Sequence, residues 1–205
     1  MPRWCFLLMK TEIRFRYIRG LLLAPAAALL MTPTFAATPA ARIGAAAPNF
    51  HLKDQFDHET SLEDFKGRVV VIVCGDRRGG DYMNDWAKAV SDNYNGPPGA
   101  LTVLRVADLV AVPPFFHSYA KQRFLAKNAE GRSARPTLLD WDALVPKLYG
   151  FTNDVTNVYV IDAQGVLRYK ASGKGTPDEI RNLIHALEDV RQQAVTSSDP
   201  ERKQP

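Results

Sequence analysis

The most reactive side chain in the middle of the sequence is the thiol of Cys74. It ends the apolar run VVVIVC at 69–74, and Arg77 and Arg78 follow within four positions. A cysteine reacts as its thiolate, and a neighbouring arginine lowers the pKa of a thiol. With a guanidinium at the sulfur, Cys74 would act as a one-cysteine thiol peroxidase or form mixed disulfides. We favour the structural alternative, because a free cysteine at the end of an apolar strand usually packs as a small hydrophobic side chain.

The turn after Cys74 offers a second chemistry, the binding of an anion. Glycines that lead into a helix leave backbone N–H groups that can hold a carboxylate or phosphate, and two arginines add positive charge. The candidate ligand- or partner-binding residues of the turn are Arg77, Arg78, Gly79, Gly80, Asp81 and Tyr82. The alternative is a solvated turn, in which Asp76 and Asp81 neutralise both arginines.

Other reactive side chains are scattered. His51, His58, His117 and His185 fall in different predicted elements, with no i, i+4 pair and no cysteine partner. Zinc and copper sites need such clusters, and no serine lies in a nucleophile-elbow context. The sequence therefore predicts no metal site and no cofactor.

Residues 1–36 have the composition of a secretory signal peptide. The basic KTEIRFRYIR precedes the apolar GLLLAPAAALLM, and small residues follow in TPTFAATPAA. We expect cleavage after Ala36, or alternatively after Ala40, and translation from Met1 or Met9. The apolar run is shorter than the roughly 20 residues that a membrane helix needs. The prediction is an exported protein, in a bacterial periplasm or secreted, with no stable membrane span after cleavage; an uncleaved N-terminal anchor is the alternative.

The charge balance argues against nucleic acid as a partner. The net charge is +4, but five of the 26 Lys and Arg residues and one of the 22 Asp and Glu residues fall within the first 36. The remaining chain carries 21 of each sign and lacks the excess of basic residues that nucleic-acid binding requires. Cys5 also lies in the leader, so the mature chain has one thiol and no internal disulfide.

The pattern of apolar residues predicts an α/β domain over 43–195, after a short linker at 37–42 and before a disordered polar tail at 196–205. Residues 43–67 suggest a β-hairpin or extended arm. A continuous β-branched run such as 68–74 is typical of a strand covered on both faces. Thr176, Pro177 and Glu179 form a capping box with Pro at the first helical position. The predicted strands are 68–74, 101–107, 137–141, 155–161 and 166–170; the predicted helices are 81–94, the stretch from 113, 142–149 and the one from 177.

The order of these elements resembles the thioredoxin-like superfamily. The stretch APNFHL, followed by SLEDFKGRVVVIV and later by VYVIDAQGVLRY, is similar to the redoxin and peroxiredoxin arm of that superfamily. The segment LLDWDALVPKLYG resembles secreted proteins of the YtfJ type. This resemblance implies a thioredoxin-like sandwich, with a central mixed β-sheet flanked by helices and an N-terminal β extension.

The resemblance also implies a degenerate dithiol site. Aligned through GRVVVIV, the two cysteines of the family's C-x-x-C motif fall near Gly79 and Tyr82. The cis-proline position falls on Thr156, which is therefore a further candidate ligand- or partner-binding residue. No threonine stands three positions before Cys74, so the peroxiredoxin T-x-x-C is absent as well. We therefore expect an exported redoxin-like protein that binds a periplasmic partner or small anionic ligand at the former active-site face. The alternative is a one-cysteine thiol peroxidase or thiol-disulfide oxidoreductase that uses Cys74.

Overall fold

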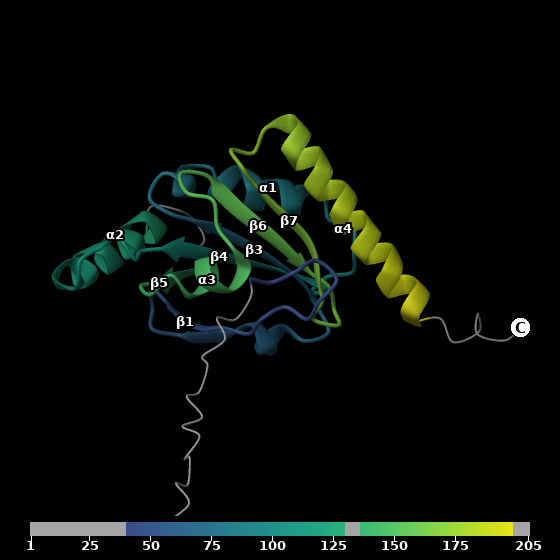
Figure 1. The fold of residues 1–205 in the computed structure, drawn as a ribbon, viewed down its shortest axis with the longest axis horizontal. Coiled ribbons are helices and arrows are strands. Elements are labelled where there is room, and N and C mark those ends of the chain that lie inside the picture. The colour runs from purple at the N-terminus through teal and green to yellow at the C-terminus, as the bar shows by residue number, and fades with distance from the viewer. Residues whose placement is uncertain (1–39, 130–135, 199–205) are drawn as a thin grey trace, which may run out of the picture. The chain divides into compact units, whose positions relative to one another are not determined.

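The computed structural model describes residues 40–129 and 136–198, and a seven-stranded mixed sheet forms the centre of this part of the chain (Figure 1). The strand order is β2-β1-β5-β4-β3-β6-β7. The strands are β1 (His51–Asp54), β2 (Glu59–Ser61), β3 (Val69–Gly75), β4 (Leu101–Asp108), β5 (Thr137–Asp140), β6 (Thr156–Ile161) and β7 (Leu167–Gly173). The α-helices are α1 (Met83–Asn93), α2 (His117–Ala129), α3 (Leu144–Tyr149) and α4 (Pro177–Ser198). The predicted α/β sandwich is confirmed.

The central strand β3 is covered on both faces, as its β-branched run predicts. It pairs in parallel with β4 and antiparallel with β6. Val70 and Ile72 belong to a core cluster on the α3 side, which also contains Tyr149. Val71 and Val73 belong to the opposite cluster, built with side chains of α1 and α4 such as Trp86. Successive residues of a strand point to opposite faces, so one run supplies both cores.

The N-terminal β extension is also confirmed. β1 and β2 form an antiparallel hairpin, and β1 joins the main sheet through β5. The carboxylate of Asp54 accepts the backbone N–H groups of Phe56 and His58 and so closes the hairpin turn. The hydroxyl of Tyr149 donates to the carbonyl oxygen of Pro48 at 2.6 Å, which fastens the arm to α3.

The cap of α4 has the geometry that its sequence predicts. The backbone N–H of Thr176 donates to Glu179 Oε2 at 2.8 Å, and the N–H of Glu179 reaches Thr176 Oγ1 at 3.4 Å. Of the predicted linker, Ala41 is buried and donates its N–H to the carbonyl oxygen of Leu148. The predicted signal peptide, residues 37–39 of the linker and residues 199–205 of the predicted tail lie outside the described residues. Residues 196–198, predicted as part of the disordered tail, instead continue α4. None of the described helices has the length and apolar character needed to cross a membrane.

Helix α2 packs loosely beside the β5 side of the sheet (Figure 1). No side chain of its residues 117–126 is buried. Two contacts hold its first turns. The His117 ring stacks on Trp141, with centroids 3.9 Å apart, and Lys121 pairs with Asp57 at 2.5 Å. Because α2 buries so little surface, space remains between it and the ends of β3 and β4.

Candidate functional site

The turn between β3 and α1 is organised by the carboxylate of Asp76. Its Oδ1 accepts the backbone N–H groups of Arg78 at 3.0 Å and Gly79 at 2.7 Å, and its Oδ2 accepts that of Asp154 at 2.8 Å. The N–H of Gly80 donates to the carbonyl oxygen of Asp76. The N–H groups of Arg78, Gly79 and Gly80 are therefore not free, because the carboxylate and the carbonyl oxygen of Asp76 accept them. An external anion has to be held by side chains instead.

Gly79 and Thr156, the two positions aligned with the family's dithiol site, lie together. The hydroxyl of Thr156 donates to the carbonyl oxygen of Gly79 at 2.6 Å, and Thr156 is fully buried. A Cβ atom at Gly79 would lie 2.3 Å from the carbonyl oxygen of Val155, far inside van der Waals contact. The backbone of Val155, the residue before β6, thus fills the space that a cysteine side chain would need. Neither Gly79 nor Thr156 lines the cavity described below.

Cys74 is buried in the α3-side core, with no exposed surface. Burial raises the pKa of its thiol well above the ordinary value, and the negative charges of Asp140, Asp108 and Asp76 raise it further. The cationic neighbour that a reactive thiolate needs is therefore replaced by carboxylates. Both the burial of Cys74 and the raised pKa of its thiol agree with the interpretation that it packs as a small hydrophobic side chain.

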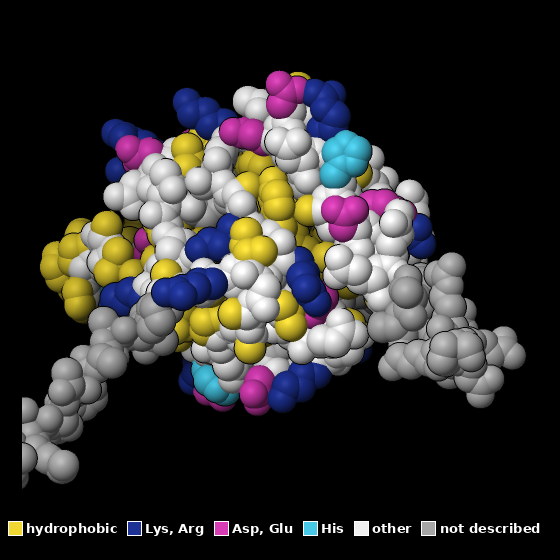
Figure 2. Space-filling model, turned by 45° about the vertical axis from the view of Figure 1, so that its right-hand side comes forward, with side chains coloured by type: hydrophobic (Ala, Val, Ile, Leu, Met, Phe, Trp, Pro, Cys, Tyr) yellow, Lys and Arg dark blue, Asp and Glu magenta, His cyan; other side chains and the backbone are white. Residues whose placement is uncertain are grey.

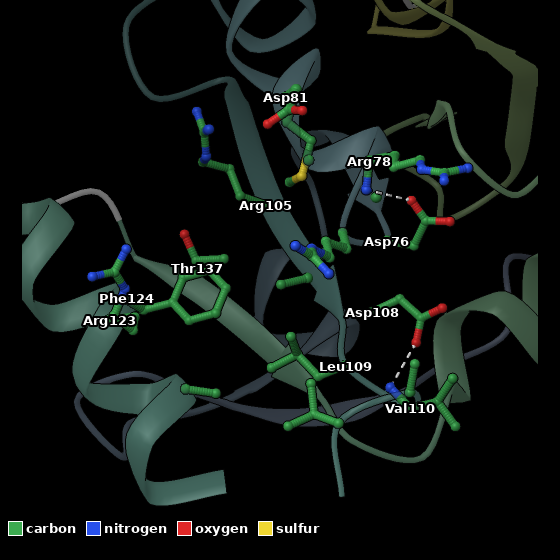
Figure 3. Close-up of a pocket in the computed structure, with 18 of the residues that line it drawn as sticks. Asp76, Arg78, Asp81, Arg105, Asp108, Leu109, Val110, Arg123, Phe124 and Thr137 are labelled. Atoms are coloured by element: carbon green, nitrogen blue, oxygen red, sulfur yellow. Dashed lines mark hydrogen bonds between the residues drawn. The ribbon is translucent and has the colours of Figure 1, made fainter. Parts of the chain in front are cut away.

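A cavity of about 1430 Å³ opens between the β3–α1 turn, the end of β4 and α2 (Figure 3). Four of the predicted binding residues line it, namely Arg77, Arg78, Gly80 and Asp81. Tyr82 does not, because it packs beside the α1–α4 core with Lys174 Nζ 5.8 Å from its ring centroid. Cys74, Gly79 and Thr156 also lie outside the lining.

The cavity lining carries four arginines, Arg77, Arg78, Arg105 and Arg123, and four carboxylates, Asp76, Asp81, Asp108 and Asp154. Arg78 pairs with Asp154 at 2.9 Å, whereas Arg77 and Arg123 make no ion pair with any residue that the structure describes. Asp76 already accepts three backbone N–H groups. Burial raises the pKa of Asp108, although a hydrogen bond from the backbone N–H of Val110 opposes the shift. Arg77 and Arg123 are thus the guanidinium groups of the lining that form no ion pair with a described carboxylate.

Several lining residues escaped the sequence-based prediction because they come from other elements. Arg105 lies on β4, Phe116 and Arg123 on the segment that enters and forms α2, and Thr137 at the start of β5. One signal was available. Arg105 interrupts the otherwise apolar strand LTVLRVAD, and a charge inside such a strand is unusual unless it is paired or faces a site.

No group of three or more His, Cys, Asp or Glu side chains within 40–129 and 136–198 is placed to hold a metal ion. The buried carboxylates serve the backbone instead. Asp140 accepts the N–H groups of Leu144 and Val145 at the start of α3, and Asp162 accepts those of Gln164 and Val166 in the β6–β7 hairpin.

Two solved structures share the thioredoxin-like fold at low sequence identity. The thiol peroxidase of Chromobacterium violaceum matches with a TM-score of 0.52 and 16% identity, over 73% of this chain and 88% of that one. The exposed lipoprotein thioredoxin of Streptococcus pneumoniae matches with a TM-score of 0.51 and 17% identity, over 67% and 98%. At these identities the likeness establishes the fold.

Sequence comparison adds the family. Peroxiredoxin Q of Oryza sativa subsp. japonica is 30% identical over 138 residues, which are 66% of this chain and 61% of that protein. The chain thus spans about three fifths of the length of the curated relatives it matches. The model of the AhpC/TSA family matches residues 43–170, the region from the N-terminal arm to β7. The chain therefore belongs to the AhpC/TSA family.

Proposed function

We propose that this protein is an exported, redoxin-like binding protein in which a ligand cavity has replaced the dithiol site. The observation that carries the proposal is the cavity itself. It lies at the face where the family places its chemistry, yet Cys74 does not line it, and the sulfur atom in its lining belongs to the thioether of Met83. A Cβ atom at Gly79 would also collide with the carbonyl group of Val155, so this position has no room for the first cysteine of a C-x-x-C motif. The degenerate site and the YtfJ-like segment support a non-catalytic member of the family.

Export to a bacterial periplasm or medium is part of this proposal. It rests on the basic, apolar and small-residue regions of the leader, which occur in the order that secretory signals use. Such a setting suits a ligand-binding protein that acts on a periplasmic partner or captures a small anion.

Arg77 gives the direct test of anion binding. Its guanidinium lines the cavity and makes no ion pair with a described residue, whereas Arg78→Ala would also release Asp154. A thermal-shift screen of small carboxylates and phosphates at low salt should find a stabilising anion. Arg77→Ala should weaken its binding about 10-fold or more, since a hydrogen bond to a charged group contributes roughly 1.5–3 kcal/mol. Added salt should weaken wild-type binding as well.

Arg181→Ala on α4 is the matched control, because Arg181 is exposed and lies outside the cavity. It should leave affinity unchanged. If no anion shifts the melting temperature, an anionic ligand is ruled out and only a protein partner would fit this face. If an anion binds both variants equally, Arg77 does not hold it.

The second candidate function is a one-cysteine peroxidase, which membership of the AhpC/TSA family favours. A peroxidatic thiolate attacks the peroxide and becomes a sulfenic acid, so it must be ionised and accessible. Cys74 is neither, because it is buried and its pKa is raised. We expect Cys74 to react with a thiol-labelling reagent only after denaturation. The mature protein should also fail to reduce insulin, which normally requires a second, resolving thiol.

A peroxide-consumption assay separates the two functions. Wild type and Cys74→Ser should both stay at the background rate. Turnover in the wild type that disappears in Cys74→Ser, together with a thiol pKa below about 8.5, would establish the peroxidase instead. Cys74→Ala serves as the packing control, because it removes the sulfur without burying a hydroxyl.

A further inference from the structure

One corner of the cavity brings together three polar side chains from three elements. Arg105 on β4 and Thr137 on β5 are register partners in the parallel pair, and Arg123 comes from α2. In Figure 3 the three lie on the same side of the cavity, across from Asp76 and Asp108. Phe124 lies on this side as well. Two guanidinium groups and a hydroxyl are a donor set that fits a carboxylate or phosphate.

Two side chains of this corner, Thr137 and Arg123, have donors without a partner among the described residues. The Thr137 side chain is nearly buried, and its hydroxyl has no hydrogen-bond partner among the described residues, although its backbone N–H donates to Gln55 at 2.8 Å. Arg123 makes no ion pair within the described ranges. Arg105 Nη2 donates to Asn84 Oδ1 at 2.6 Å. The corner is therefore the cationic end of the cavity.

The adjoining wall is apolar. It consists of Leu109, Val110, Val112, Phe116 and Phe124, from the β4–α2 connection and α2 itself. Val110 is 54% exposed and Phe116 50%, with the exposed Phe115 and Tyr119 beside them in the sequence. Hydrophobic side chains also gather on the surface at the α2 side of the domain (Figure 2). Contiguous exposed apolar surface of this kind usually marks a binding site.

The hydrogen bonds that the backbone around the cavity already makes distinguish between possible ligands. The end of β4 that borders the cavity, residues 105–108, pairs with β5 on one edge, and β4 pairs with β3 on the other. The N–H groups of Arg78 and Gly79 in the turn are held by Asp76. An extended peptide draws much of its affinity from main-chain hydrogen bonds to a free strand edge, and the cavity offers none. Its volume also exceeds the roughly 300–1,000 Å³ of common small-molecule pockets. A long apolar ligand with one charged end fits both facts.

We propose that the cavity binds an anionic alkyl ligand, with its carboxylate or phosphate head on Arg105, Arg123 and Thr137. Its hydrocarbon chain lies along the wall formed by Leu109, Val112, Phe116 and Phe124. This assignment rests on the proposed binding function and names the ligand class and the subsite for the charged end. The cationic corner orients the ligand, and the apolar wall buries its hydrocarbon chain.

Isothermal titration of the mature chain with decanoate tests the proposal. Three further probes separate the contributions of the hydrocarbon chain and of the charged group. Decanol has the chain without the charge, and acetate has the charge without the chain. Decyl phosphate has the chain with a phosphate in place of the carboxylate. Vesicles of anionic phospholipid distinguish a lipid surface from a free ligand. We expect decanoate and decyl phosphate to bind, decanol to bind at least 10-fold more weakly, and acetate and vesicles not to bind measurably.

Two variants locate the head group. Arg123→Gln should weaken decanoate about 10-fold or more and leave decanol unchanged, and Thr137→Val should weaken decanoate several-fold. Arg181→Gln, the same charge change on α4, should have no effect. Arg123 is exposed, so the melting temperature of Arg123→Gln should match that of the wild type and exclude misfolding.

The outcomes separate this subsite from the broader binding function. If Arg123→Gln and Thr137→Val bind decanoate as tightly as the wild type does, the proposed head-group site is wrong. If only Arg77→Ala loses affinity for decanoate, the anion binds at the β3–α1 turn and the proposed binding function is retained. Failure of decanoate, with binding of a short anion or an acidic peptide that depends on Arg77, overturns the alkyl class only. If no probe binds and Arg77→Ala has no phenotype, both proposals are wrong.

Discussion

Gly79→Ala should lower the free energy of unfolding by about 3 kcal/mol or more, at the upper end of overpacking effects. The added Cβ would meet the carbonyl oxygen of Val155 at 2.3 Å and its carbonyl carbon at 2.6 Å. No side-chain rotation relieves a contact with backbone, so either the turn or β6 has to move. Such a movement also disturbs the 2.6 Å hydrogen bond from Thr156 to the Gly79 carbonyl. Urea denaturation of both proteins measures the difference.

Gly80→Ala is the matched control in the neighbouring residue. A Cβ at Gly80 has no atom within 4 Å, and its backbone does not require glycine. We expect a change within about 0.5 kcal/mol, or a small stabilisation from the lower entropy of the unfolded chain. Equal stability of the two variants would contradict the close approach of β6 to Gly79. It would also remove the steric objection to a cysteine there.

Ile161→Ala should destabilise the protein by about 2–5 kcal/mol, the usual cost of truncating a buried isoleucine. Ile161 ends β6, is 1% exposed and lies opposite Val70 in the antiparallel pair with β3. Its side chain belongs to the same core cluster as Cys74 and Tyr149. Truncation leaves a cavity in this cluster. The strands β3 and β7, which pair with β6 on its two edges, limit how far the backbone can move to fill it.

Ile43→Ala makes the same chemical change at the start of the domain. Ile43 is 60% exposed, so its truncation should stay within about 0.5 kcal/mol. The difference between the two midpoints in urea isolates the contribution of burial. A near-neutral Ile161→Ala would mean that β6 does not occupy the centre of the sheet.

Much of the fold could be predicted because its signals are local. The β-branched run at 69–74 indicates a strand covered on both faces, and Thr176, Pro177 and Glu179 indicate the start of a helix. These patterns depend on the period of an element and on hydrogen bonds within a few residues. The sequence also shows directly that Cys74 has no second cysteine near it, because the chain contains only Cys5 and Cys74.

The candidate site could be predicted only in part. The sequence locates it at the turn after β3, and Arg77, Arg78, Gly80 and Asp81 do line the cavity. It also indicates that Cys74 packs in the core, which burial and the raised pKa of its thiol support.

The rest is decided by contacts between distant segments. Whether the Asp76 carboxylate pairs with a cation or binds backbone N–H groups depends on where Asp154 lies. The hydrogen bond from the N–H of Asp154 to Asp76 joins two segments that are far apart in the sequence. Arg105 and Thr137 meet only through the register of β4 with β5, and α2 leaves the cavity open because its side chains find little to pack against. Local patterns determine which elements form and which chemical groups they carry. Only the tertiary structure decides which groups face one another, because strand register and helix placement result from the packing of the whole domain.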